Sequence, residues 1–440
     1  MCLSVCLFFS IFSISLHAQR TGYTKEEFLR RRAVLMDKVK NGMILLFSKA
    51  EDTPSIRFRQ DNDFYYYTGC VDKNAILVMI PKTREAVLFL PKLEDREVLY
   101  LGDNLLGVAG SKEKSGLSDI LPLSDFKDFV AKNIEKSEKT LYIRLSPADT
   151  IDHSRWENVW LAARKARNVY NTQQTLDLFR NEMLKKEYPD FEMKDVVTFI
   201  DEMRLIKSPE EIEILRRNGK ISAEAIKQAM LASKPGGYEY EVEAAAMYVI
   251  LKNGANGPAY SPIVGSGPNS CILHYQKSER QTKEGDLLLM DFGADLDYLC
   301  MDITRTWPVS GKFTPEQRKV YQTVLEVQKA CIEVYRPGIT ADEVRKHVDE
   351  VLKKKNIDPM GLKGGMHHYV GMSTHDVGKY GIPLQEGMVF TIEPGVYLQE
   401  KDLGIRIEDT ILITKDGCEV LSKDVPKEID EIEALLSKRK

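Results

Sequence analysis

The sequence of 440 residues has few cysteines and no thiolate metal motif. Seven cysteines occur, and two of them, Cys2 and Cys6, lie at the very start of the chain. The other five are scattered, and no CxxC pair is present. The sequence therefore indicates neither a disulfide framework nor a thiolate zinc site.

An excess of positive charge is also absent. The chain carries 62 Lys and Arg against 66 Asp and Glu, which gives a net charge of −4. Proteins that bind nucleic acid usually show a basic surplus, so we expect no nucleic-acid partner. The apolar fraction of 43% is large enough for a packed core, and the length is sufficient for two or three domains.

Long apolar runs are missing except near the N-terminus. Residues 3–16 (LSVCLFFSIFSISL) carry no charge, and polar sequence begins after Ala18. Those 14 residues are too few to cross a bilayer about 30 Å thick, so we expect no stable membrane insertion. The pattern is typical of a secretory signal peptide over residues 1–18, which predicts a periplasmic or secreted protein. If the first codon is wrongly assigned, the protein is cytoplasmic instead.

The rest of the chain is predicted to form two domains. Three β-rich runs between residues 42 and 92, namely MILLF, AILVMI and AVLFL, are followed by helical patterns over 127–137 and 155–168. These patterns place an α/β domain in the first part of the chain. The predicted units are an N-terminal domain over 19–170, a polar helical connector over 171–200 and a second domain over 201–440.

The second domain contains an internal repeat. A helix start with capping residues, SPEE at 208–211, recurs as TPEQ at 314–317, which is 106 residues later. Pro235-Gly236 recurs as Pro337-Gly338 after 102 residues, and each pair precedes another helical pattern. Strand-like runs follow in both copies. This pattern predicts a duplicated domain whose halves meet at a pseudo-twofold axis, although chance recurrence of short caps is an alternative.

Four carboxylates follow the same two offsets. Asp291 ends the run LLLM, and Glu393, 102 residues later, ends the run VFTI. Asp302 lies in the next predicted strand, and Glu408 lies 106 residues later in the predicted strand GIRIEDTILI. Buried carboxylates are costly unless a cation neutralises them. The set therefore predicts two divalent metal ions in an oxygen-rich site, which suits Mn²⁺.

Histidines provide candidate nitrogen ligands. Seven histidines occur in the chain, and four of them are His274, His367, His368 and His375. A single histidine in such a stretch is more often structural than a ligand. The spacing alone does not decide which of the adjacent His367 and His368 binds a metal.

Several segments together resemble a known family. His274-Tyr275, MDFGADLDYLCMDITRTWPV, HYVGMSTHDVG, FTIEPGVY and GIRIEDTILI are similar to segments of the pita-bread metallopeptidases, with aminopeptidase P as the nearest branch. The resemblance covers about residues 200–425 and extends to RFRQDNDFYYYTG (57–69), which is similar to a signature of that branch's accessory domain. It implies an α/β protein with an N-terminal α/β accessory domain and a C-terminal duplicated pita-bread (α+β) catalytic domain.

The resemblance also implies roles for individual residues. It assigns as metal ligands Asp291, Asp302, His368, Glu393 and Glu408, of which Asp302 and Glu408 would bridge the two ions. The further catalytic residues that it implies are Glu393 as proton shuttle, His274 and His375 on the substrate, and Arg406, expected on the same strand face as Glu408. One departure is Gly364, where the family has another histidine; His367 is a candidate to replace it.

The implied activity is removal of the N-terminal residue from peptides with proline at the second position, by a hydroxide that bridges two metals. The implied assembly is a homodimer or a homotetramer. Two alternatives remain open. One is a prolidase, which cleaves Xaa-Pro dipeptides, and the other is a non-catalytic pita-bread module that binds peptides or proteins.

Overall fold

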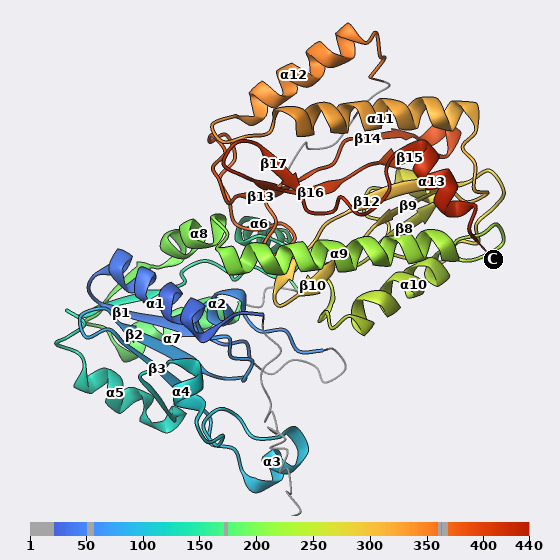
Figure 1. Cartoon of the computed structure of the whole chain (residues 1–440). Helices are drawn as coiled ribbons and strands as arrows, with labels where there is room; N and C mark the ends of the chain where they lie inside the picture. Colours follow the sequence, from blue (N-terminus) through green and yellow to red (C-terminus); the bar gives the residue numbers. More distant parts are fainter. Residues whose placement is uncertain (1–21, 51–56, 171–174, 360–361, 363–367, 440) are drawn as a thin grey trace, which may run out of the picture.

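The computed structural model describes residues 22–439, except 51–56, 171–174, 360–361 and 363–367 (Figure 1). The predicted signal peptide (1–18) lies outside the described residues, as do Gly364 and His367. None of the helices in the described part combines the length and apolar character that a bilayer crossing requires.

The N-terminal part is built on a mixed sheet of six strands in the order β4-β3-β2-β1-β5-β6. The predicted runs MILLF, AILVMI and AVLFL form its antiparallel centre, because β1 pairs with β2 and β2 with β3. The strands are β1 (Met43–Phe47), β2 (Ile76–Ile80), β3 (Glu85–Leu90), β4 (Asp119–Pro122), β5 (Thr140–Ile143) and β6 (Glu192–Asp195).

Eight helices accompany this sheet in the described residues. They are α1 (Lys25–Val39), α2 (Asn62–Thr68), α3 (Asp95–Leu101), α4 (Ser111–Ser115), α5 (Phe126–Lys132), α6 (Arg155–Lys165), α7 (Leu176–Glu187) and α8 (Val197–Leu205). The stretch 171–200, predicted as a connector, contains α7 and β6, and β6 extends the sheet by parallel pairing with β5.

Helix α2 joins the N-terminal part to the second domain. Asp61 caps it by accepting a hydrogen bond from the backbone N–H of Phe64, and Gly69 ends it with φ of 63°. A side chain on Gly69 would strike the ring of Phe28, so this position requires glycine. Tyr65 of α2 stacks on Tyr298 of the second domain with ring centroids 3.5 Å apart.

The second domain contains the predicted repeat. Its first half comprises α9 (Pro209–Ala232), α10 (Glu239–Lys252), β7 (Gly257–Pro258), β8 (Ile263–Ser266), β9 (Leu287–Asp291), β10 (Ala294–Leu296), β11 (Leu299–Cys300) and β12 (Thr304–Pro308). Its second half comprises α11 (Pro315–Val334), α12 (Ala341–Lys354), β13 (Val389–Ile392), β14 (Gly395–Leu398), β15 (Leu403–Arg406), β16 (Asp409–Ile413), β17 (Cys418–Val420) and α13 (Ile429–Leu436). Figure 1 shows β9 and β12 of the first half and β13 and β16 of the second half lying between the long helices α9 and α11.

The helix starts that define the repeat are confirmed. In α9, Ser208 accepts from the backbone N–H of Glu211, and the Glu211 carboxylate accepts from the N–H of Ser208. Thr314 and Gln317 form the same reciprocal pair at α11. Each pair satisfies two backbone donors that an α-helix leaves unpaired, so both copies begin for the same local reason.

Two carboxylates differ from the expected placement within strands. Asp302 lies between β11 and β12, and Glu408 lies between β15 and β16. The backbone N–H of Asp302 donates to the hydroxyl of Thr410, and that hydroxyl donates back to the carbonyl of Asp302. Glu408 N–H donates to the carbonyl of Thr304. The strands are interrupted there because backbone groups of one half bond across to the other half.

A fully buried ion pair also joins the two halves. Arg305 of β12 and Asp409 of β16 lie 2.7 Å apart, and both side chains have no exposed surface. Ser422 and Lys427 donate to the same carboxylate. Burial raises the pKa of Asp409, but Arg305 and Lys427 outweigh burial and lower it to about 2.

We expect Asp409→Asn to destabilise the protein by about 3–5 kcal/mol at pH 7, because it leaves Arg305 buried without its counter-ion. An unfolded aspartate has a pKa of about 3.9, so the stabilisation is complete above that pH and is lost as pH falls toward 2. Denaturant unfolding between pH 7 and pH 2 measures the free energy of unfolding of both proteins. The difference between wild type and variant should shrink below about pH 4. A difference in free energy that stays constant over this pH range would contradict the role of Asp409 as the counter-ion of Arg305.

Candidate metal centre

All eight residues predicted as site residues line one cavity of about 290 Å³, which Asp152 and His153 of the N-terminal part also line. Five are the predicted ligands Asp291, Asp302, His368, Glu393 and Glu408, and three are His274, His375 and Arg406. The first half supplies Asp291 at the end of β9, and the second half supplies Glu393 directly after β13. The matched offsets in the sequence therefore correspond to convergence in space.

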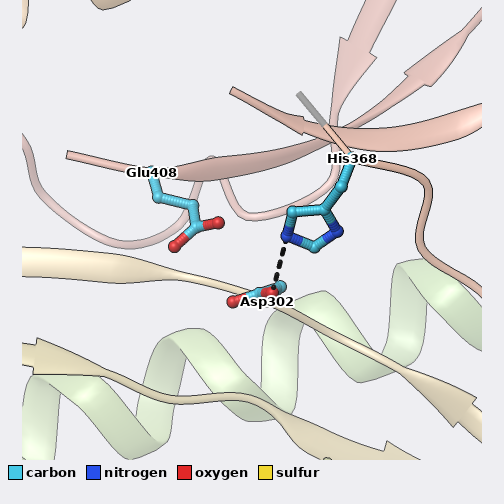
Figure 2. Close-up of side chains that lie close together, drawn as sticks. All are labelled: Asp302, His368 and Glu408. Atoms are coloured by element: carbon cyan, nitrogen blue, oxygen red, sulfur yellow. Dashed lines mark ion pairs between the residues drawn. The ribbon is translucent and has the colours of Figure 1, made fainter. Parts of the chain in front are cut away.

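Three donor side chains form the closest group. One ligand atom each of Asp302, His368 and Glu408 lies within 4.8 Å of the other two. Figure 2 shows these side chains directed toward a common point, with Asp302 from the first half and the others from the second. The Nε2 atom of His368 lies 3.4 Å from Asp302 and 3.3 Å from Glu393. A borderline divalent ion accepts this mixture of imidazole and carboxylate donors.

The backbone of His368 is held against β13. Its N–H donates to the hydroxyl of Thr391, and its carbonyl accepts from the Thr391 N–H. The same hydroxyl donates to Glu393 at 3.2 Å. Thr391 therefore sets the position of two predicted ligands at once.

Tyr260 bridges the two acidic residues of the first half, and the sequence did not point to it. Its hydroxyl contacts both Asp291 and Asp302, the latter at 2.6 Å. A hydroxyl has one proton, so it can donate to only one of these carboxylates at a time. An isolated tyrosine outside the repeated motifs carries no local pattern that would have identified it.

Arg406 contacts Asp291 and does not lie on a common strand face with Glu408. The expectation of a shared face is wrong because β15 ends at Arg406. The guanidinium pairs with Asp291 at 2.6 Å and donates from Nε to the hydroxyl of Thr304 at 2.9 Å. Thr304 in turn donates to Glu408 at 2.6 Å. Arg406 therefore reaches Glu408 through Thr304.

Burial and mutual repulsion make the carboxylates hard to ionise together. Burial, followed by the charge of Asp302, raises the pKa of Asp291 to about 7, even with Arg406 beside it. Burial raises the pKa of Glu408 well above its ordinary value, and the charges of Asp302 and Glu393 raise it further. Divalent cations at this position would neutralise the repulsion, so these donors fit metal ions.

Asp302 and His368 behave as an ion pair. Burial favours the uncharged form of each group, but the contact between them outweighs burial. It lowers the pKa of Asp302, while Asp302 and Glu393 raise the pKa of His368 to about 9. A metal ligand must be unprotonated, so metal binding at this position displaces the proton from His368.

Comparison with known proteins identifies the family. The model of metallopeptidase family M24 matches residues 213–415, and that of the aminopeptidase P N-terminal domain matches residues 28–142. The Xaa-Pro aminopeptidase of Escherichia coli is 35% identical over 94% of this chain and 98% of its own length. The chain belongs to metallopeptidase family M24. It is therefore a hydrolase, and family M24 implies divalent metal ions.

Other relatives cover similar lengths. The Xaa-Pro aminopeptidase of Haemophilus influenzae is 32% identical over 94% of this chain and 97% of its own. The mitochondrial intermediate cleaving peptidase 55 of Arabidopsis thaliana is 31% identical over 94% and 84%. The structure of E. coli aminopeptidase P with the inhibitor Pro-Leu has a TM-score of 0.79 at 33% identity, covering 94% of this chain and 98% of that one. The predicted architecture, an N-terminal accessory domain followed by a pita-bread catalytic domain, is thereby confirmed.

Asp302→Asn is expected to weaken divalent-metal binding and to lower kcat by about 10³-fold or more, because bound metals supply several kcal/mol of transition-state stabilisation. The melting temperature should stay near that of wild type, since the change removes a buried negative charge from a crowded site. Calorimetric titration with Mn²⁺ and peptide turnover measure the two effects. Asp402→Asn, in an exposed loop, makes the same chemical change away from the cavity and is the matched control. If Asp302→Asn bound metal with wild-type affinity, Asp302 would not be a metal ligand.

Proposed function

We propose that this M24 metallopeptidase is an Xaa-Pro aminopeptidase that uses two divalent metal ions, with Mn²⁺ as the working metal. The convergence of five donor side chains from both halves in one cavity carries the proposal. The N-terminal domain supports it, because it matches the aminopeptidase P family model. Relatives that span almost the whole chain are named Xaa-Pro aminopeptidases.

The residues that would hold the ions are Asp291, Asp302, His368, Glu393 and Glu408. When bound there, the ions would supply a water of lowered pKa that can act as the nucleophile near neutral pH. The oxygen-rich donor set with one imidazole and no thiolate supports Mn²⁺. Tyr260 and Thr304 orient the carboxylates by hydrogen bonds at 2.6 Å to Asp302 and Glu408, respectively.

Glu393 is the proposed proton shuttle. Its side chain is 23% exposed, against 6% for Asp302, so Glu393 is the more accessible of the two to a water or a leaving group. It would accept a proton from the attacking water and deliver one to the nitrogen of the departing peptide. Thr391 donates to its Oε1 atom and restricts its orientation.

His274 and His375 are proposed to contact the scissile peptide. Burial lowers the pKa of His274, and the neighbouring Arg406 and His375 lower it further, so its imidazole is neutral near pH 7. Both histidines line the cavity that contains the carboxylates. Fixed donors at this position would stabilise negative charge as it forms on the substrate carbonyl oxygen.

The individual carboxylate oxygens that line the cavity account for the proposed choice of the first peptide bond. A free α-amino group is positively charged and is attracted to carboxylates in a cavity with little water. Proline at the second position gives a scissile nitrogen that has no N–H, so the site needs no acceptor for that proton. The site would then recognise the substrate by its N-terminal amine, its carbonyl group and its proline ring.

Hydrolysis of Arg-Pro-Pro, Ala-Pro and Ala-Ala-Ala in Mn²⁺, with mass analysis of the products, tests the proposal. We expect release of free arginine from Arg-Pro-Pro, little cleavage of Ala-Ala-Ala, and loss of turnover after chelation that Mn²⁺ restores better than Mg²⁺ or Zn²⁺. Turnover of Ala-Pro without Arg-Pro-Pro would identify a prolidase. No turnover of any peptide with any ion would identify a non-catalytic binding module.

We also propose that the protein is exported and assembles as a homodimer or a homotetramer. Residues 3–16 support export by their apolar character. Exposed apolar side chains support assembly, since surfaces of this kind favour association. They include Leu99 and Tyr100 of α3, at 83% and 72% exposure, and Trp156 of α6 at 75%.

Native mass spectrometry of the protein purified from a bacterial host tests both expectations. We expect subunits that begin at Gln19 in the periplasmic or culture fraction, and complexes of two or four subunits. A full-length chain in the cytoplasm would contradict export. A species of one subunit at micromolar concentration would contradict assembly.

A further inference from the structure

The loop before β13 is attached to the N-terminal part of the chain at consecutive residues. Ser373 donates from its hydroxyl to the Asp149 carboxylate at 2.9 Å, and the N–H of Thr374 donates to the carbonyl of Ile151 at 2.7 Å. Asp376 pairs with Arg204 of α8 at 2.6 Å, and Arg204 also pairs with Asp149 at 2.6 Å. His375 lies between these anchored positions, so its backbone is held from outside the catalytic domain.

The side chain of His375 is held from the same direction. Its Nδ1 atom lies 2.6 Å from Oε1 of Glu157, in the first turn of α6. The other oxygen of Glu157 accepts from the N–H of Ser154 at 2.8 Å and from its hydroxyl at 3.0 Å. The helix cap therefore fixes the carboxylate, and the carboxylate fixes the imidazole.

The chemistry of this contact determines how the ring is presented. Burial raises the pKa of Glu157, but the hydrogen bonds from His375 and Ser154 lower it to about 2, so the group is an ionised carboxylate near neutral pH. A carboxylate only accepts hydrogen bonds, so Nδ1 of His375 carries a proton. The remaining ring nitrogen, Nε2, is left for the cavity that His375 lines.

We propose that Glu157 is a positioning residue for catalysis, supplied by the segment of the chain N-terminal to the catalytic domain, and that it holds His375 with Nδ1 protonated and Nε2 directed at the substrate. The proposal rests on the proposed function in one respect, which is the contact between His375 and the scissile peptide. Through Glu157, the N-terminal part of the chain then takes part in positioning a catalytic group, in addition to any role in substrate access.

A second glutamate in the chain provides a matched control. Glu343 occupies the same third helical position in α12 and forms the same capping box, with Thr340. It is exposed and does not line the metal cavity. Substitutions at Glu343 therefore measure the loss of a helix cap alone, whereas substitutions at Glu157 also remove the contact with His375.

The test compares Glu157→Leu and Glu157→Ala with Glu343→Leu and Glu343→Ala in the full-length Mn²⁺ enzyme. We expect kcat on Arg-Pro-Pro to fall about 100-fold in the Glu157 variants, because misplacing a catalytic group by about 1 Å costs on that order. KM should change by less than about threefold, since the lost contact acts in the transition state. Both Glu343 variants should retain wild-type kcat.

Histidine-labelled ¹⁵N NMR of the same proteins reports the ring directly when diamagnetic Mg²⁺ replaces Mn²⁺, because Mn²⁺ broadens the signals of nearby groups. A Nδ1–H signal that disappears in His375→Asn is assigned to His375, and we expect it in wild type and in the Glu343 variants but not in the Glu157 variants. Wild-type kcat in Glu157→Leu, or an unchanged Nδ1–H signal in both Glu157 variants, would overturn the proposal. A wild-type enzyme inactive on Xaa-Pro peptides would contradict the proposed function, while the NMR comparison would still decide the role of Glu157.

Discussion

Repulsion between buried carboxylates around one cavity is the constraint on which the rest of this structure depends. Asp291, Asp302 and Glu408 are almost fully buried around one small space, and the pKa of Asp291 rises to about 7 as a result. Hydrogen bonds from Tyr260 and the ion pair with Arg406 relieve only part of this cost. The fold must therefore hold the groups together with energy gained elsewhere, from the core and from pairs such as Arg305 with Asp409. Metal ions turn this unfavourable arrangement into a binding site.

The N-terminal part is coupled to the centre through a buried network of charges. Asp63 of α2 pairs with Arg155 at 2.6 Å and with Arg204 at 2.9 Å, and Arg204 continues to Asp376 in the loop that carries His375. These side chains have almost no contact with solvent, so removing one partner leaves an uncompensated charge. Such a network holds one relative orientation of the two domains. The position of His375 therefore depends on both domains.

Local sequence patterns predicted many of the helices, strands and site residues. The features that these patterns did not predict depend on contacts between residues far apart in the sequence. The caps at Ser208 and Thr314 predicted helix starts because the interaction spans only three residues. Asp291 and Glu393 could be matched because duplication repeats their spacing. Glu157 has the local pattern of an ordinary capping residue, and its contact with His375 lies 218 positions away in the sequence. The strand breaks at Asp302 and Glu408 were missed for the same reason, since hydrogen bonds to the opposite half interrupt runs with continuous strand character.

The exchange of hydrogen bonds between Asp302 and Thr410 has a consequence for how the centre comes into being during folding. The first half brings two of the candidate donors and the second half brings three, so neither half holds a complete set. The centre exists only after the two halves have closed on each other. Uptake of metal is then a late event in the maturation of the polypeptide, and a molecule whose second half is still open stays inert as a peptidase.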